Sequence, residues 1–153
     1  MTGTGWIDRL GLQAHPEGGW FRRLYTDPRE AGGRPLASSI HYLLAGPQRL
    51  GRLHRNRSTI LHFLQSGGPV EYLQIEPGQE PRRTRLAFDG ALFLSVPGGV
   101  WKGSRLLDGA EHALVSEVVI PGFDWQDHEY LDPTELARWR AAYGIALAPW
   151  AGG

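Results

Sequence analysis

The sequence predicts an all-β fold, a sandwich or jelly roll, with short helices only near the two ends of the chain. Eight short segments rich in β-branched and aromatic residues follow one another through the middle of the 153-residue chain. Turn sequences with glycine and proline separate most of these segments. The totals of 21 glycines and 11 prolines suit many short strands joined by tight turns.

The turn chemistry also predicts which strands are neighbours. Asp89-Gly90 stands between two apolar runs, a strong signal for a two-residue hairpin. The Gly67-Gly68-Pro69 turn similarly predicts that the strands on either side of it pair. The predicted strands cover residues 19–25, 37–44, 58–65, 70–75, 84–88, 91–96, 102–106 and 114–120.

Helices are expected at both ends of the chain. Residues 6–12 have room for two turns that end near Gly11. Asp132, Pro133 and Glu135 form a good helix start, because an aspartate cap, a proline and an early glutamate each favour the first turn. The pattern predicts a helix over about 133–143, stopped by Gly144 and packed on the outside of the β-structure by an apolar stripe: Leu136, Trp139, Ala142 and Tyr143.

Composition narrows the function classes. Lys+Arg and Asp+Glu are both 16, and this neutral balance gives no electrostatic reason to expect nucleic acid or an anionic membrane as a partner. There is no cysteine, which excludes a thiolate site and fits a cytoplasmic location. No apolar run reaches the length of a membrane span, and no secretory signal is visible. We therefore expect a single domain over residues 1–153.

One motif is specific. His15-Pro16-Glu17-Gly18-Gly19 is followed in order by 39–44, by the histidine-bearing segments 53–55 and 61–63, and by Pro121-Gly122-Phe123. The chain thereby resembles the cupin family marked by this HPEGG motif (cupin family five), one of the RmlC-like jelly rolls. The resemblance implies a jelly-roll β-barrel over about 15–130, a pocket for a small molecule, and a homodimer. It does not imply a reaction.

The resemblance also places the metal ligands of other cupins on this chain. The first histidine position is His54, the second is Asn56, and the glutamate position falls on Thr59 or Ile60. The last histidine position holds Lys102, whose ammonium has no lone pair to give. The expected cofactor is therefore none. The alternative is a divalent iron, manganese, nickel or zinc ion held by His54 and His62.

The sequence allows two orientations for the strand that carries His62. If Thr59 points inward, so do Leu61 and Phe63, and His62 points outward; a shift by one residue brings His62 inward. The predicted hairpin places Glu71 or Tyr72 opposite His62. A carboxyl or phenol group beside an imidazole would make a general acid/base pair, whereas a solvent-facing Glu71 would not.

Other side chains are candidates for substrate binding. Arg55 and Lys102 are expected to hold an anionic group, and Lys102 is alternatively an amine nucleophile or a surface residue. Trp101 and Phe123 are expected to wall the pocket or to lie in the core. Glu17 is expected to cap the turn made by the two glycines after it. An acidic cluster with one histidine, 124–129, is expected to be a solvated loop at the barrel mouth.

Three functions fit these residues. The first is a metal-independent isomerase, epimerase or lyase that uses His54, His62 and Glu71 for proton transfer on a polar anionic metabolite, bound by Arg55, Tyr72, Trp101, Lys102 and Phe123. The second is a metal-dependent oxygenase or decarboxylase. The third is a small-molecule-binding protein without catalysis.

Overall fold

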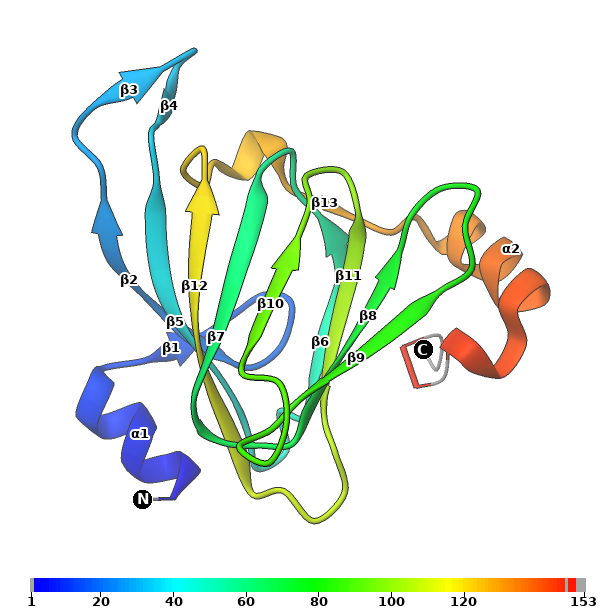
Figure 1. The fold of residues 1–153 in the computed structure, drawn as a ribbon, viewed down its shortest axis with the longest axis horizontal. Helices are drawn as coiled ribbons and strands as arrows, with labels where there is room; N and C mark the ends of the chain where they lie inside the picture. The colour runs from blue at the N-terminus through cyan, green and yellow to red at the C-terminus, as the bar shows by residue number, and fades with distance from the viewer. Residues whose placement is uncertain (1, 148, 151–153) are drawn as a thin grey trace.

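The computed structural model describes residues 2–147 and 149–150, and its strands form two facing sheets (Figure 1). One sheet has the order β1-β2-β5-β12-β7-β10, and the other has the order β13-β6-β11-β8-β9. A separate hairpin, β3-β4, extends beyond one end of the barrel. The strands are β1 (Gln13–Ala14), β2 (Trp20–Thr26), β3 (Glu30–Ala31), β4 (Arg34–Pro35), β5 (Ser38–Ala45), β6 (Leu50–Arg55), β7 (Thr59–Gly67), β8 (Val70–Ile75), β9 (Arg82–Leu86), β10 (Phe93–Val96), β11 (Trp101–Leu106), β12 (His112–Ile120) and β13 (Glu129–Tyr130).

This architecture confirms the all-β jelly roll, but two predicted pairings are wrong. β7 pairs with β12 and β10, whereas β8 pairs with β11 and β9, so the Gly67-Gly68 turn carries the chain from one sheet to the other. The Asp89-Gly90 turn exists, since Gly90 N–H donates to the Ala87 carbonyl at 2.9 Å. It joins β9 to β10, which again lie in different sheets.

β6 was not predicted as a strand. Glycine and two arginines dilute its β-forming residues, so its sequence lacks a clear apolar alternation. It is nevertheless the neighbour of β11, with His54 opposite Lys102. This pairing places both side chains at the same level of the barrel.

The helices lie outside the sheets. α1 (Gly3–Leu10) begins earlier than predicted, because the Thr2 side chain caps the Gly5 N–H, and it ends at Gly11 in the left-handed conformation (φ 62°). α2 (Pro133–Tyr143) has Asp132 as its N-cap, as its sequence predicts. Short 3₁₀ turns span Trp125–Asp127 and Gly144–Leu147. Within the described residues, no helix is both long and apolar enough to cross a membrane.

The interior between the sheets holds apolar side chains together with several buried polar ones. Alternation along β7 buries Ile60, His62 and Leu64, while Phe63 is exposed. His62 therefore points inward, which settles the phase that the sequence left open. The larger apolar cluster includes Tyr42, Leu44, Val70, Tyr72, Leu86 and Val115.

Candidate functional site

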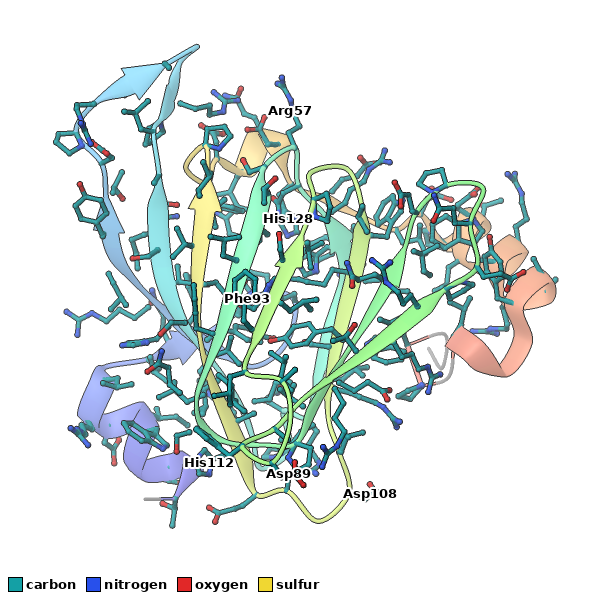
Figure 2. All side chains as sticks on the ribbon, in the orientation of Figure 1. Arg57, Asp89, Phe93, Asp108, His112 and His128 are labelled. Carbon is teal, nitrogen blue, oxygen red and sulfur yellow. The ribbon has the colours of Figure 1, made fainter. Side chains whose placement is uncertain are left out.

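A small cavity lies inside the barrel, lined by both polar and apolar side chains. The centre of a water molecule can move through about 40 Å³ of it, space for about three waters. His128, which lines it, lies toward the barrel end from which Arg57 projects, away from Asp89 and Asp108 (Figure 2). The lining residues are His15, Glu17, Phe21, Ile40, His54, Asn56, Ile60, Glu117, Val119, Phe123 and His128.

The HPEGG turn aims Glu17 into this cavity. Gly18 has a φ of 102°, and a Cβ there would lie 2.2 Å from the Leu50 carbonyl oxygen, so only glycine fits. The backbone carbonyl of Glu17 accepts from Arg52 N–H at 2.8 Å, and Tyr42 donates to the Gly18 carbonyl at 2.5 Å. These bonds hold the turn against β6 and β5, and the Glu17 side chain points inward with 8% of its surface exposed.

Glu17 and His54 share a proton. His54 Nδ1 lies 2.6 Å from the Arg52 carbonyl oxygen, to which it can only donate. The neutral ring therefore has a lone pair on Nε2, which lies 3.1 Å from Glu17 Oε2. A carboxylate oxygen and a lone pair cannot make this contact without a proton between them. Burial raises the pKa of Glu17 to about 8, and burial together with the charge of Lys102 lowers the pKa of His54 well below its usual range. The proton therefore resides on Glu17 near neutral pH.

Two further imidazoles border the carboxyl group of Glu17. His128 Nε2 lies 3.9 Å from Glu17 Oε2, and its ring is parallel to that of His54, with centroids 5.1 Å apart. This Nε2 is buried and has no hydrogen-bond partner among the described residues. His15 Nδ1 accepts from the Glu17 backbone N–H at 3.0 Å. Burial lowers the pKa of His128, and it lowers that of His15 to about 4, so both rings are neutral at pH 7.

A second polar cluster joins β7, β11 and β12 inside the barrel. Lys102 Nζ lies 2.8 Å from His62 Nε2 and 3.3 Å from Glu117 Oε1. His62 Nδ1 lies 3.1 Å from the Leu94 carbonyl oxygen, so Nδ1 donates there and Nε2 accepts from Lys102. The Tyr72 ring packs 4.9 Å from His62, and its buried hydroxyl has no partner among the described residues.

The structure thus brings five of the eight site residues expected from the sequence into the barrel interior: His54, His62, Tyr72, Lys102 and Phe123. The other three lie elsewhere.

Glu71 lies outside the barrel. It accepts from Arg105 at 2.9 Å and from Arg83 at 3.4 Å. The expectation that Glu71 stands beside His62 is wrong because β8 does not pair with β7, and because Tyr72 takes the inward position. Among the residues of this strand, alternation leaves Tyr72 in and Glu71 out.

Arg55 and Trp101 also face outward, beneath α2. The Arg55 guanidinium lies 4.5 Å from the centre of the Trp101 ring and donates to Glu129 at 2.9 Å. Trp101 packs edge-on against Trp139 of α2. An outer groove of about 370 Å³ lies here, larger than the inner cavity. We place the candidate site in the inner cavity, since that is where the buried acid and the imidazoles meet.

Four cavity residues were missed or misassigned from the sequence: His15, Glu17, Glu117 and His128. Glu17 does stand in a tight turn, but its carboxyl group faces the cavity. His128 follows the Trp125–Asp127 turn and is buried rather than part of a solvated loop, with 4% of its side chain exposed. Glu117 carried a usable signal, because it is the single carboxyl group in a strand made mostly of apolar residues.

The described residues also change the expected metal ligands. His54 and His62 do not form a ligand pair, since the Nε2 lone pair of His62 is directed at the ammonium of Lys102. Glu17, His54 and His128 instead bring one ligand atom each within 4.8 Å of one another. Two imidazoles and a carboxylate suit a divalent iron, manganese or zinc ion. An ion there would take the place of the proton that Glu17 and His54 share.

Comparison with known proteins agrees with this architecture. The family described as Cupin superfamily (DUF985) matches residues 4–131. The uncharacterized protein YML079W of Saccharomyces cerevisiae is 34% identical in an alignment 147 positions long, and the match covers 82% of this chain and 73% of the yeast protein.

Solved structures show the same fold. A hypothetical protein from Leishmania major superposes with a TM-score of 0.86 at 28% identity, covering 95% of this chain and 96% of that one. Protein SO0799 from Shewanella oneidensis gives 0.87 at 25% identity, with 95% of each chain covered. A mutant of Bacillus subtilis oxalate decarboxylase gives 0.60 at 14% identity, over 86% of this chain and 34% of that one, a likeness in fold alone.

Proposed function

Since the chain belongs to the DUF985 family of the cupin superfamily, we propose that it is a small-molecule enzyme that transfers protons without a metal, as an isomerase or epimerase. One observation carries the proposal: the carboxyl oxygen Oε2 of the buried Glu17 lies 3.1 Å from Nε2 of His54 inside a cavity. A neutral acid beside neutral imidazoles can give one proton and accept another in the same step. A lyase that eliminates water would use the same groups.

The chemistry balances within the chain. Glu17 gives its proton to a substrate oxygen while an imidazole nitrogen of His54 or His128 removes a proton from carbon, which forms an enol. The imidazole then returns a proton to carbon, and the substrate oxygen returns the other proton to Glu17. These two transfers complete an isomerisation or epimerisation. The raised pKa of Glu17, about 8, keeps the acid protonated near neutral pH.

The cavity favours a small polar substrate. The described residues that line it include no arginine or lysine. Lys102 is paired with Glu117, and Arg55 lies outside the barrel. The case for an anionic substrate is therefore weaker than the sequence indicated, and we propose an uncharged or singly charged hydroxy or carbonyl compound.

Hydrogen–deuterium exchange tests the proposal. The protein is incubated in D₂O, in the presence of a chelator, with a panel of small hydroxy-carbonyl compounds, and deuterium at carbon is followed by NMR. We expect exchange with at least one compound, its loss in Glu17→Gln and His54→Gln, and its retention in the matched controls Glu71→Gln and His41→Gln. His41 is a suitable control because it lies on β5 between the inward-facing Ile40 and Tyr42, and therefore faces the opposite side of the sheet. Binding without exchange would show a binding protein instead.

A metal-dependent enzyme is the second candidate, and the convergence of Glu17, His54 and His128 favours it. Bound metal would act there as a Lewis acid toward a substrate oxygen. Elemental analysis of protein purified without a tag separates the two candidates. A stoichiometric metal that disappears in Glu17→Gln, together with exchange abolished by chelator, would replace the metal-independent proposal.

A homodimer and a cytoplasmic location are also proposed, the first from the family resemblance and the second from the absence of cysteine. Light scattering on the purified protein tests the first, since a monomer mass at micromolar concentration would contradict it.

A further inference from the structure

The side chain of Lys102 ends inside the barrel between an imidazole and a carboxylate, two groups that are common metal ligands in proteins. Its Nζ lies 2.8 Å from His62 Nε2 and 3.3 Å from Glu117 Oε1, and these two ligand atoms are 3.6 Å apart. His62, Lys102 and Glu117 are 0%, 5% and 7% exposed, so this contact lies away from the surface of the protein. Each group comes from a different strand, β7, β11 or β12.

The hydrogen-bond directions identify the ammonium as the group being held. His62 donates from Nδ1 to the Leu94 carbonyl, which leaves the Nε2 lone pair for the ammonium. Glu117 adds a carboxylate oxygen. An imidazole nitrogen and a carboxylate oxygen at this separation form the type of donor set that divalent transition metals use in proteins.

We propose that the Lys102 ammonium is the resident cation of the barrel interior, and that His62 and Glu117 form a latent divalent-metal site that the Lys102 side chain fills. The chain thereby supplies a fixed positive charge beside its cavity. That charge contributes to lowering the pKa of both His54 and His128. In the proton transfer proposed above, on which this role rests, it also stabilises the Glu17 carboxylate that forms when the acid gives its proton to the substrate oxygen.

Cobalt titration tests the latent site independently of any enzyme activity. Co²⁺ is added to the wild type and to Lys102→Ala, with bound metal measured by equilibrium dialysis and ligand geometry by visible absorption. We expect Lys102→Ala to bind one more Co²⁺ per chain than the wild type. Adding Glu117→Gln to Lys102→Ala should abolish that extra binding, whereas adding Glu71→Gln should not. Equal Co²⁺ stoichiometry in the wild type and Lys102→Ala would overturn the proposal.

A measurement on the wild type covers the case in which Lys102→Ala does not fold. Nitrogen-15 NMR of labelled histidine reports which ring nitrogen carries the proton. We expect His62 to be protonated at Nδ1 alone, with Nε2 accepting a hydrogen bond. A proton on Nε2 would leave no lone pair for Lys102 and would overturn the proposal. A failure of the deuterium-exchange experiment would leave both outcomes unaffected, so the two proposals can fail separately.

Discussion

Glu17→Gln should make the protein more stable at high pH, although it removes a buried functional group. The carboxyl group has a pKa of 4.5 in ordinary surroundings and of about 8 in the folded protein. Between these two pH values the unfolded chain has released the proton while the folded protein still holds it. The unfolded state therefore gains about 1.4 kcal/mol per pH unit relative to the folded state. This stability is present in full below pH 4.5 and is lost as the pH rises to about 8.

The size of the effect follows from the same two values. Across the whole interval the wild type loses on the order of 3–5 kcal/mol through this one group. Glutamine has nearly the same shape, its amide N–H still donates to His54 Nε2, and it does not titrate. The difference in unfolding free energy between Glu17→Gln and the wild type should therefore be small at pH 5 and should grow in favour of the variant by several kcal/mol at pH 8.

Urea denaturation followed by tryptophan fluorescence at pH 5, 6, 7 and 8 measures this difference. Glu71→Gln is the matched control, because it removes a carboxyl group that pairs with arginines outside the barrel; its effect should stay within about 1 kcal/mol. If the free-energy difference between Glu17→Gln and the wild type does not change with pH, the folded protein does not hold a proton on Glu17, and the acid assigned to the site is wrong.

Three further substitutions test the geometry. Lys102→Met leaves the Glu117 carboxylate buried without its partner and should lower the unfolding free energy by about 3–5 kcal/mol. In a double-mutant cycle followed by denaturation, Lys102→Met/Glu117→Gln should recover most of this lost stability. No recovery would mean that the two groups are not coupled. Trp101→Ala removes a ring packed under α2 and should cost about 3–5 kcal/mol, with the NMR signals of the cavity histidines unshifted; a large shift would place Trp101 in the site. Gly18→Ala forces a Cβ against the Leu50 carbonyl at φ 102° and should lower the melting temperature by roughly 10 °C; calorimetry showing no loss would contradict the tight turn.

Local sequence predicted the strands better than their partners. Alternating β-forming residues and glycine-rich turns located most of the long strands, because both signals act within a few residues. The same turn signals led to wrong predictions of strand pairing at Gly67-Gly68 and at Asp89-Gly90. A tight turn fixes a reversal of the chain, but the sheet that each arm joins depends on partners far along the sequence, such as β12 for β7. β6 was missed because pairing with β11, rather than its own composition, makes it a strand.

The residues of the candidate site show the same difference between what local sequence predicts and what depends on distant contacts. For residues on regular strands, the alternation of side chains limited the possibilities to two. One of the two placed His62 inward, and Tyr72 was predicted as the alternative to Glu71 opposite it. Glu17 and His128 reach the cavity from turns, where no periodicity predicts direction. Their positions depend on long-range contacts, such as the hydrogen bond from Arg52 N–H to the Glu17 carbonyl. Sequence reasoning therefore identified His54, which lines the cavity, but paired it with Glu71, whose carboxyl group lies outside the barrel.

The two buried glutamates, Glu17 and Glu117, have different surroundings, and their proposed roles follow from this difference. Glu117 lies 3.3 Å from an ammonium, which compensates a negative charge. Glu17 faces neutral imidazoles, and burial raises its pKa because the charge of Lys102, which pairs with Glu117, offsets only part of the cost of ionisation. One carboxyl group is thus suited to hold a cation and the other to hold a proton. Burial raises the pKa of Glu17 and lowers that of the neighbouring His54, and a cavity that separates the pKa values of an acid and a base in this way is equipped for acid–base chemistry. The charge of Lys102 contributes to the lowered pKa of His54.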